Sequence, residues 1–190
     1  MASIAVVYHS GYGHTAVLAQ SIAQGAASVA GTEVHLVPVE EAEAKLAVLD
    51  AADAIVFGSP TYMGSASAKF HEFMEFTSKI WYGRGWKDKL AAGFTVSASQ
   101  SGDKLNTLFQ LALFAAQHGM LWVGSDLLPG NNSSQGSVED LNRLGSFLGA
   151  MAQANADQGP DVAPPHSDRK TAEMLGVRVA EATARWLRGK

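Results

Sequence analysis

The N-terminal stretch combines an apolar run, a glycine-containing turn and a helical pattern, and this combination restricts the fold more than any other feature. Residues 4–8 are apolar without alternation, which is typical of a strand buried on both faces of a sheet. After residue 15, apolar side chains recur at helical spacing, which predicts a helix that packs back onto the strand. A turn between such elements receives free backbone N–H groups and the positive end of the helix dipole.

The turn itself has the composition of a phosphate-binding loop. It contains two glycines, the two aliphatic hydroxyl side chains of Ser10 and Thr15, and no Lys or Arg. Glycine lets the backbone approach a ligand closely, and hydroxyls supply donors that carry no net charge. We therefore expect phosphate to bind at Ser10, Gly11, Tyr12, Gly13, His14 and Thr15.

Strand and helix patterns alternate along the chain, which predicts an α/β fold with a parallel sheet covered on both faces. The expected strands are residues 3–8, 33–39, 54–58, 90–96 and 120–123. The expected helices are residues 15–30, 41–49, 66–79 and 104–117, with Leu105, Leu108, Leu111, Ala112 and Ala115 facing inward in the last of these. A final helix is expected to begin near the capping candidates Ser167 and Asp168.

The region after residue 125 is harder to interpret. Residues 126–137 read as a loop that leaves the sheet, and residues 159–165 read as an extended, proline-rich surface segment. Residues 138–155 fit a short helix to about 144, followed either by more helix or by a strand through residues 149–154. Both alternatives stay open at this point.

Three of the expected strands end in loops rich in Gly, Ser and Thr. In a parallel α/β sheet, ligands bind beyond the carboxyl ends of the strands, so we expect the three loops to form one pocket. Besides the first loop, the candidate residues are Pro60, Thr61, Tyr62, Met63 and Gly64 after the third strand, which begins its loop at Ser59. The loop after the fourth strand contributes Ser97, Ala98, Ser99, Gln100, Ser101 and Gly102.

Composition excludes several classes of function. The formal net charge is −4 and Lys and Arg form no cluster, which disfavours nucleic-acid and anionic-membrane binding. The absence of Cys excludes disulfides and a cysteine nucleophile, and we expect a cytoplasmic location. The histidines lack metal-ligand spacing, so no metal site is expected, and the absence of a G-x-S-x-G elbow disfavours a serine hydrolase.

Five sequence landmarks follow one another along the chain. They are the loop at residues 10–15, the loop at residues 59–64, Trp81, the Lys-Leu-Ala sequence at residues 89–91 and the His-Gly-Met sequence at residues 118–120. In this order they resemble landmarks of the tryptophan-repressor-binding-protein (WrbA-like) NAD(P)H:quinone oxidoreductases of the flavodoxin-like superfamily, in which the first two loops read Ser-x-Tyr-Gly-His and Thr-Pro-Thr-Arg-Phe-Gly. The resemblance covers essentially the whole chain.

The resemblance implies a single flavodoxin-like domain over residues 1–190 with strand order 2-1-3-4-5 and a fifth strand interrupted around residues 126–137. It also implies bound FMN, with NAD(P)H as co-substrate, a quinone as acceptor and ping-pong transfer of two electrons. A homo-oligomer, dimer or tetramer, is expected. By resemblance, His118 lies near the pyrimidine carbonyl of the flavin, and Trp81 reaches the active site of a neighbouring subunit to help stack the substrate.

Some features depart from the family pattern or leave alternatives. The Arg of the second loop is Tyr62 here, and the third loop lacks the usual Gly-Thr-Gly-Gly sequence. The spacing Gly11-x-Gly13-x-x-Ala16 also satisfies a dinucleotide-binding fingerprint, with Glu40 as the ribose acid, although the other two loops would then have nothing to bind. A one-electron flavodoxin carrier and a flavin-binding regulatory protein with little turnover are the alternative functions.

Overall fold

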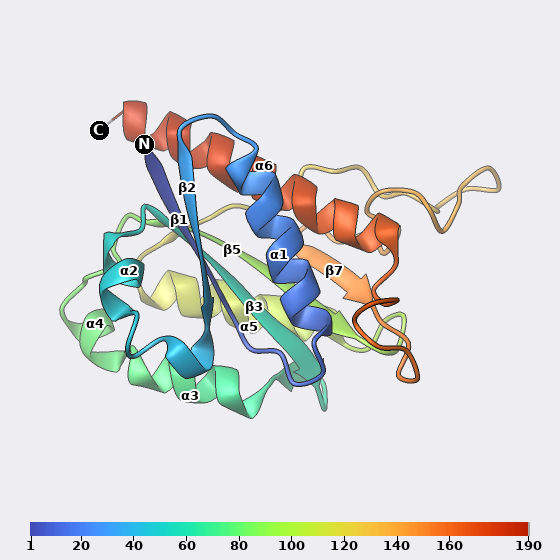
Figure 1. The fold of residues 1–190 in the computed structure, drawn as a ribbon, viewed down its shortest axis with the longest axis horizontal. Coiled ribbons are helices and arrows are strands. Elements are labelled where there is room, and N and C mark those ends of the chain that lie inside the picture. The colour runs from blue at the N-terminus through green and yellow to red at the C-terminus, as the bar shows by residue number, and fades with distance from the viewer. Residues whose placement is uncertain (190) are drawn as a thin grey trace.

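A computed structural model describes residues 1–189, and its centre is a parallel sheet. The strands follow the order β2 (Thr32–Pro38), β1 (Ala2–Tyr8), β3 (Ala54–Tyr62) and β5 (Leu90–Ser97), and then β6 (Leu121–Trp122) and β7 (Ala150–Gln153). Figure 1 shows helices on both sides of this sheet. The predicted α/β class and the order 2-1-3-4-5 are confirmed when β6 and β7 are counted as two parts of the fifth strand.

The fifth strand is split by a long excursion. β6 pairs with the start of β5, where Leu90 lies opposite Leu121, and β7 pairs with its end, where Phe94 lies opposite Ala150. Residues 123–149 leave the sheet between the two pieces. The expected interruption is therefore confirmed, and of the two alternatives for residues 149–154 the strand is correct.

The short helix predicted for residues 138–144 is wrong, because these residues form turns. The turns are held by the buried Asn142 side chain, whose Nδ2 donates to the Leu127 carbonyl at 2.9 Å. Its Oδ1 accepts from the Ser146 backbone N–H at 2.8 Å. A side chain that bonds local backbone groups competes with helix formation, which explains the difference.

The core consists of two layers, one on each face of the sheet. Alternate residues of β1 point in opposite directions, so that Ile4 and Val6 belong to one layer and Ala5 and Val7 to the other. The helices α1 (His14–Ala27) and α6 (His166–Arg188) cover the first layer. The second layer is covered by α2 (Leu46–Ala51), α3 (Ala68–Phe76) and α5 (Lys104–Gln117).

Two predicted helices are interrupted. The helix predicted for residues 66–79 is divided at Thr77 into α3 and α4 (Ser78–Tyr82), because the Thr77 hydroxyl donates to the Met74 carbonyl at 2.7 Å and the backbone leaves helical geometry. The start of this segment is instead a short strand, β4 (Ser65–Ala66), paired antiparallel with β3. The helix predicted for residues 41–49 is a 3₁₀ turn, η1 (Val39–Glu41), followed after an irregular turn by α2.

Two further details of the helices differ from expectation. Leu105 was expected to face the core but is 62% exposed, whereas Leu108 and Leu111 on the same helix are buried. Ser167 and Asp168 do not cap α6, which begins after Pro165. The Ser167 hydroxyl donates to the Val138 carbonyl, and Asp168 accepts two hydrogen bonds from Arg143 at 2.7 and 2.8 Å. Both side chains anchor the excursion rather than the helix end.

A membrane-spanning helix and a cluster of metal ligands are both absent from the described residues. Within residues 1–189, no helix is long and apolar enough to cross a membrane. The same part of the chain contains no group of three or more His, Cys, Asp or Glu side chains that could hold a metal ion.

Candidate functional site

The carboxyl ends of β1, β3, β5 and β7 meet at one edge of the sheet, and a cavity of about 670 Å³ lies there. Its volume falls in the range typical of small-molecule sites. Each of the three predicted loops contributes to its wall. The predicted residues that line it are Tyr12, His14, Thr15, Pro60, Thr61, Tyr62, Ser97 and Ala98.

The first loop presents a row of unpaired backbone donors. Within the described part of the chain, the N–H groups of residues 11–15 donate to no protein acceptor. Gly13 holds φ at +89°, immediately before α1, and its carbonyl accepts the first helical bond from Val17. The Ser10 hydroxyl accepts from the Ala16 N–H at 3.1 Å, which leaves its own hydrogen available. Successive free N–H groups at a helix start form an anion site.

The second predicted loop is largely a continuation of β3. Thr61 is buried, and its Oγ1 lies 2.8 Å from the hydroxyl oxygens of both Thr95 and Thr107. Thr61 therefore fixes the strand end rather than offering a free donor. Pro60 pairs with Val96 of β5 but lies beyond the last residue pair between β3 and β1. Proline has no backbone N–H, and at this position no residue of β1 requires one as a partner.

Tyr62 closes the gap between the first two loops. A Cβ atom added at Gly11 would lie 2.6 Å from its hydroxyl oxygen, so a larger residue at position 11 would require the Tyr62 side chain to shift. The Tyr12 ring meets the Tyr62 ring edge to face, with centroids 6.2 Å apart. Burial, assisted by Tyr12, raises the pKa of the Tyr62 hydroxyl, so it stays protonated at neutral pH. Two aromatic walls therefore border the cavity.

The turn after β3 lies outside the cavity wall. Met63 has φ at +50° and its side chain is fully exposed, and Gly64 follows with φ at +77°. Asn106 of α5 donates to the Gly64 carbonyl at 2.7 Å and fixes the turn. Neither Met63 nor Gly64 lines the cavity.

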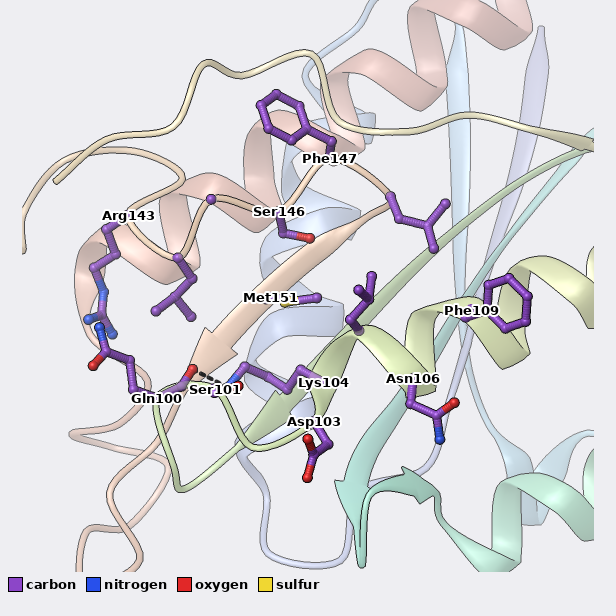
Figure 2. Close-up of a pocket in the computed structure, with 14 residues that line it drawn as sticks. Gln100, Ser101, Asp103, Lys104, Asn106, Phe109, Arg143, Ser146, Phe147 and Met151 are labelled. Atoms are coloured by element: carbon purple, nitrogen blue, oxygen red, sulfur yellow. Dashed lines mark hydrogen bonds between the residues drawn. The ribbon is translucent and has the colours of Figure 1, made fainter. Parts of the chain in front are cut away.

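The third loop is divided between two cavities. Ser97 and Ala98 line the cavity described above, whereas Gln100 and Ser101 line a second cavity of about 1330 Å³. This second cavity lies between α5 and residues 143–148 (Figure 2). Ser99 and Gly102 line neither of the two cavities. The loop therefore forms the partition between them.

A fourth segment, residues 154–159, was missed by the sequence analysis. It follows β7 and lines the cavity with Ala154, Ala156, Asp157, Gln158 and Gly159. The His14 Nε2 atom lies 2.8 Å from the Gln158 carbonyl oxygen, which joins this segment to the first loop. The signal was present, since a strand through residues 149–154 would end at the same sheet edge as the other strands.

His118 does not belong to this cavity in the same chain. It follows the C-terminal end of α5, and the 14 residues of that helix span about 21 Å from the third loop. The side chain is 2% exposed, packs against Trp86 and Phe114, and places Nε2 3.0 Å from the Thr77 hydroxyl. Burial, with a smaller effect of the Arg84 guanidinium, lowers the pKa of His118 to about 4.

Trp81 also lies away from the cavity of its own chain. It is on α4, near the end of the sheet opposite the strand carboxyl ends, and 43% of it is exposed.

Comparison with known proteins assigns the family. Residues 29–135 match the model of the NADPH-dependent FMN reductases. The chain belongs to this family. The matched region begins just after α1 and runs through β5 and α5 into the excursion, so it includes the second and third loops of the site.

Relatives of this FMN reductase family member carry two kinds of name. The chain is 41% identical to flavodoxin FldP of Pseudomonas aeruginosa, with 95% of this chain and 96% of that protein covered. It is 33% identical to an NAD(P)H dehydrogenase (quinone) of Archaeoglobus fulgidus, with 95% and 97% covered. Its structure resembles the flavodoxin, WrbA-like protein from Agrobacterium tumefaciens at 38% identity and a TM-score of 0.75, with 97% and 99% covered.

Proposed function

We propose that residues 1–190 form one FMN-binding domain that passes two electrons from NAD(P)H to a quinone. The observation that supports this most is the row of unpaired N–H groups at residues 11–15, beside a cavity walled by two tyrosines. Free amides suit a phosphate dianion, and the aromatic rings suit a flat ring system. Family membership agrees with a flavin and a nicotinamide.

The residues present fit FMN. The first loop would bind the phosphate through the backbone of Gly11, Tyr12, Gly13, His14 and Thr15, and through the hydroxyls of Ser10 and Thr15. Tyr62 and Tyr12 would pack beside the ring, and the third loop would border its pyrimidine edge. When bound, FMN supplies hydride acceptance and two-electron transfer, and the protein supplies positioning and exclusion of water.

The nicotinamide and the quinone would use the same exposed face of the ring in turn, which gives ping-pong kinetics. Trp81 is available on the surface to complete such a slot in a neighbouring copy, so we propose a homo-oligomer as the active form. His118 has no part in this proposal, because it is buried among Trp86, Phe114 and Thr77.

Purified protein tests the proposal directly. We expect bound or readily bound FMN in the absorbance spectrum, and oxidation of NADH or NADPH that depends on added benzoquinone. In double-reciprocal plots of initial rate against NAD(P)H concentration, parallel lines at several quinone concentrations would establish the ping-pong order. A protein that stays colourless with micromolar FMN would contradict the proposal.

A one-electron flavodoxin carrier is the second candidate, because the relative at 41% identity is named a flavodoxin. The formal charge of −4 over 190 residues is milder than the strongly acidic character of such carriers. Reductive titration separates the two functions. Accumulation of one-electron-reduced flavin without quinone-dependent NAD(P)H oxidation would favour the carrier.

A further inference from the structure

The partition between the two cavities is built around a buried lysine ammonium. Lys104, the first residue of α5, is 1% exposed, and its Nζ donates three hydrogen bonds of 2.8 Å. The acceptors are the Ser97 hydroxyl and the carbonyls of Ser99 and Gln100. Figure 2 shows Lys104 reaching back from α5 to the loop, with the bond to Gln100 dashed.

All three acceptors are neutral, and no carboxylate within residues 1–189 forms an ion pair with this ammonium. The Arg143–Asp168 ion pair lies behind it, and Asp168 favours the protonated amine while Arg143 opposes it. Burial lowers the pKa of Lys104 to about 8, so it remains largely charged at neutral pH. Burying an ammonium costs free energy unless hydrogen bonds satisfy it, so Lys104 and its three loop acceptors hold each other in place.

The ammonium also determines which way the loop amides face. The carbonyls of Ser99 and Gln100 point to Lys104, and the Ala98 carbonyl accepts from Gln153 Nε2 at 3.2 Å. In a trans peptide the N–H points opposite to the C=O of the same peptide, so the N–H groups of Gln100 and Ser101 face away from Lys104. Within residues 1–189 these two N–H groups donate to no protein acceptor.

We propose that Lys104 is a positioning residue that fixes the third loop at the cavity wall, through its hydrogen bond to Ser97, and raises the reduction potential of bound FMN. The inference rests on the proposed function. Two-electron reduction at neutral pH adds negative charge to the pyrimidine side of a flavin, and a fixed positive charge behind the adjoining loop favours that form.

The test compares Lys104→Met with Lys89→Met in protein reconstituted with FMN. Lys89 is a matched control, because it also donates to backbone carbonyls, those of Asp50 and Ala52, but at the start of β5, away from the cavity. The measurements are the affinity for oxidised FMN and the midpoint potential against a reference dye. Lys104→Arg serves as the rescue variant.

We expect Lys104→Met to weaken binding of two-electron-reduced FMN about tenfold more than binding of oxidised FMN, which lowers the midpoint potential by about 30 mV. Lys89→Met should leave the potential unchanged, and Lys104→Arg should restore most of it. A folded, FMN-bound Lys104→Met protein with the wild-type potential overturns the inference. So do equal shifts in the two Met variants.

If Lys104→Met does not fold, the wild-type protein still decides the question by titration. The charged groups that face Lys104 are Arg143 of the excursion and Asp168 of α6. Negative charge on reduced FMN should raise the pKa of Lys104, so between the pKa values of the oxidised and the reduced protein, reduction takes up one additional proton and the fall of potential steepens by about 30 mV per pH unit. A constant slope overturns the inference. Failure of the wild-type protein to bind FMN instead contradicts the proposed function itself.

Discussion

Gly13 has a left-handed backbone conformation and lies in the loop that we propose binds the phosphate. Its φ is +89°, and an added Cβ would lie 2.8 Å from Pro160 Cγ. Gly13→Ala should therefore distort the loop and weaken FMN binding at least tenfold, since left-handed backbone costs about 1–2 kcal/mol in a residue with a Cβ. Gly31→Ala is the matched control, because Gly31 has φ at +78° with nothing near the Cβ position. Fluorescence titration with FMN checks both, and equal losses would contradict a special role of the first loop.

His118 should make stability depend on pH. Its folded pKa of about 4 is below the unfolded value of about 6.5, so between these values the unfolded chain binds more protons and stability falls as pH falls. The buried Nδ1 has no partner in the described residues, so a proton there would find no acceptor. Between pH 7.5 and pH 5 the loss should be about 2 kcal/mol.

Urea unfolding at the two pH values measures this loss for wild type, His118→Gln and the exposed control His166→Gln. His118→Gln should lose this part of the pH dependence, whereas His166→Gln should keep it. An unchanged pH dependence in His118→Gln would show that other groups are responsible.

At the scale of elements, α1 and α6 approach each other through paired glycines. A Cβ added at Gly25 would overlap the Glu173 carbonyl oxygen, and one at Gly176 would overlap the Ile22 carbonyl oxygen. Gly176→Ala should therefore destabilise the protein by about 1–3 kcal/mol through overpacking, despite the better helix propensity of Ala. Gly83→Ala is the control, because its added Cβ would have only ordinary contacts. Thermal unfolding checks the pair, and a Gly176→Ala protein as stable as wild type would show that the helices can separate without cost.

Short-range sequence patterns correctly predicted the strands and helices that short-range interactions specify. The buried strands at residues 4–8 and 54–58 and the helix at 104–117 are confirmed, because apolar runs and helical spacing specify them directly. The turns at residues 138–144 depend on Asn142, Arg143 and their bonds to distant residues, including Asp168. No window of sequence contains these contacts, so a helical pattern was misleading there.

Part of the cavity wall was also predictable from the sequence, and part was not. The topological rule placed three loops at one sheet edge, but the segment at residues 154–159 depended on recognising a four-residue strand, β7. The hydrogen bonds from Lys104 to the third loop could not be predicted from the sequence either, because a lysine at the first position of a helix is normally solvated.

For the whole molecule, a ligand at this edge would connect the ends of β1, β3, β5 and β7 with the start of α1. Since FMN would bind only the folded chain, it should stabilise that state by about 4 kcal/mol at a concentration of 1000 Kd. For a chain of this size the melting temperature should rise by roughly 8–16 °C. Riboflavin lacks the phosphate, so at the same concentration its shift should be much smaller.

Differential scanning fluorimetry with both ligands measures these shifts, with the Gly13→Ala protein as the internal comparison. That variant should respond to FMN and riboflavin more equally, because only the phosphate contacts are impaired. Equal shifts for the two ligands in the wild-type protein would mean that the free amides of residues 11–15 do not bind the phosphate. The cavity would then bind a ring system with its charged group elsewhere.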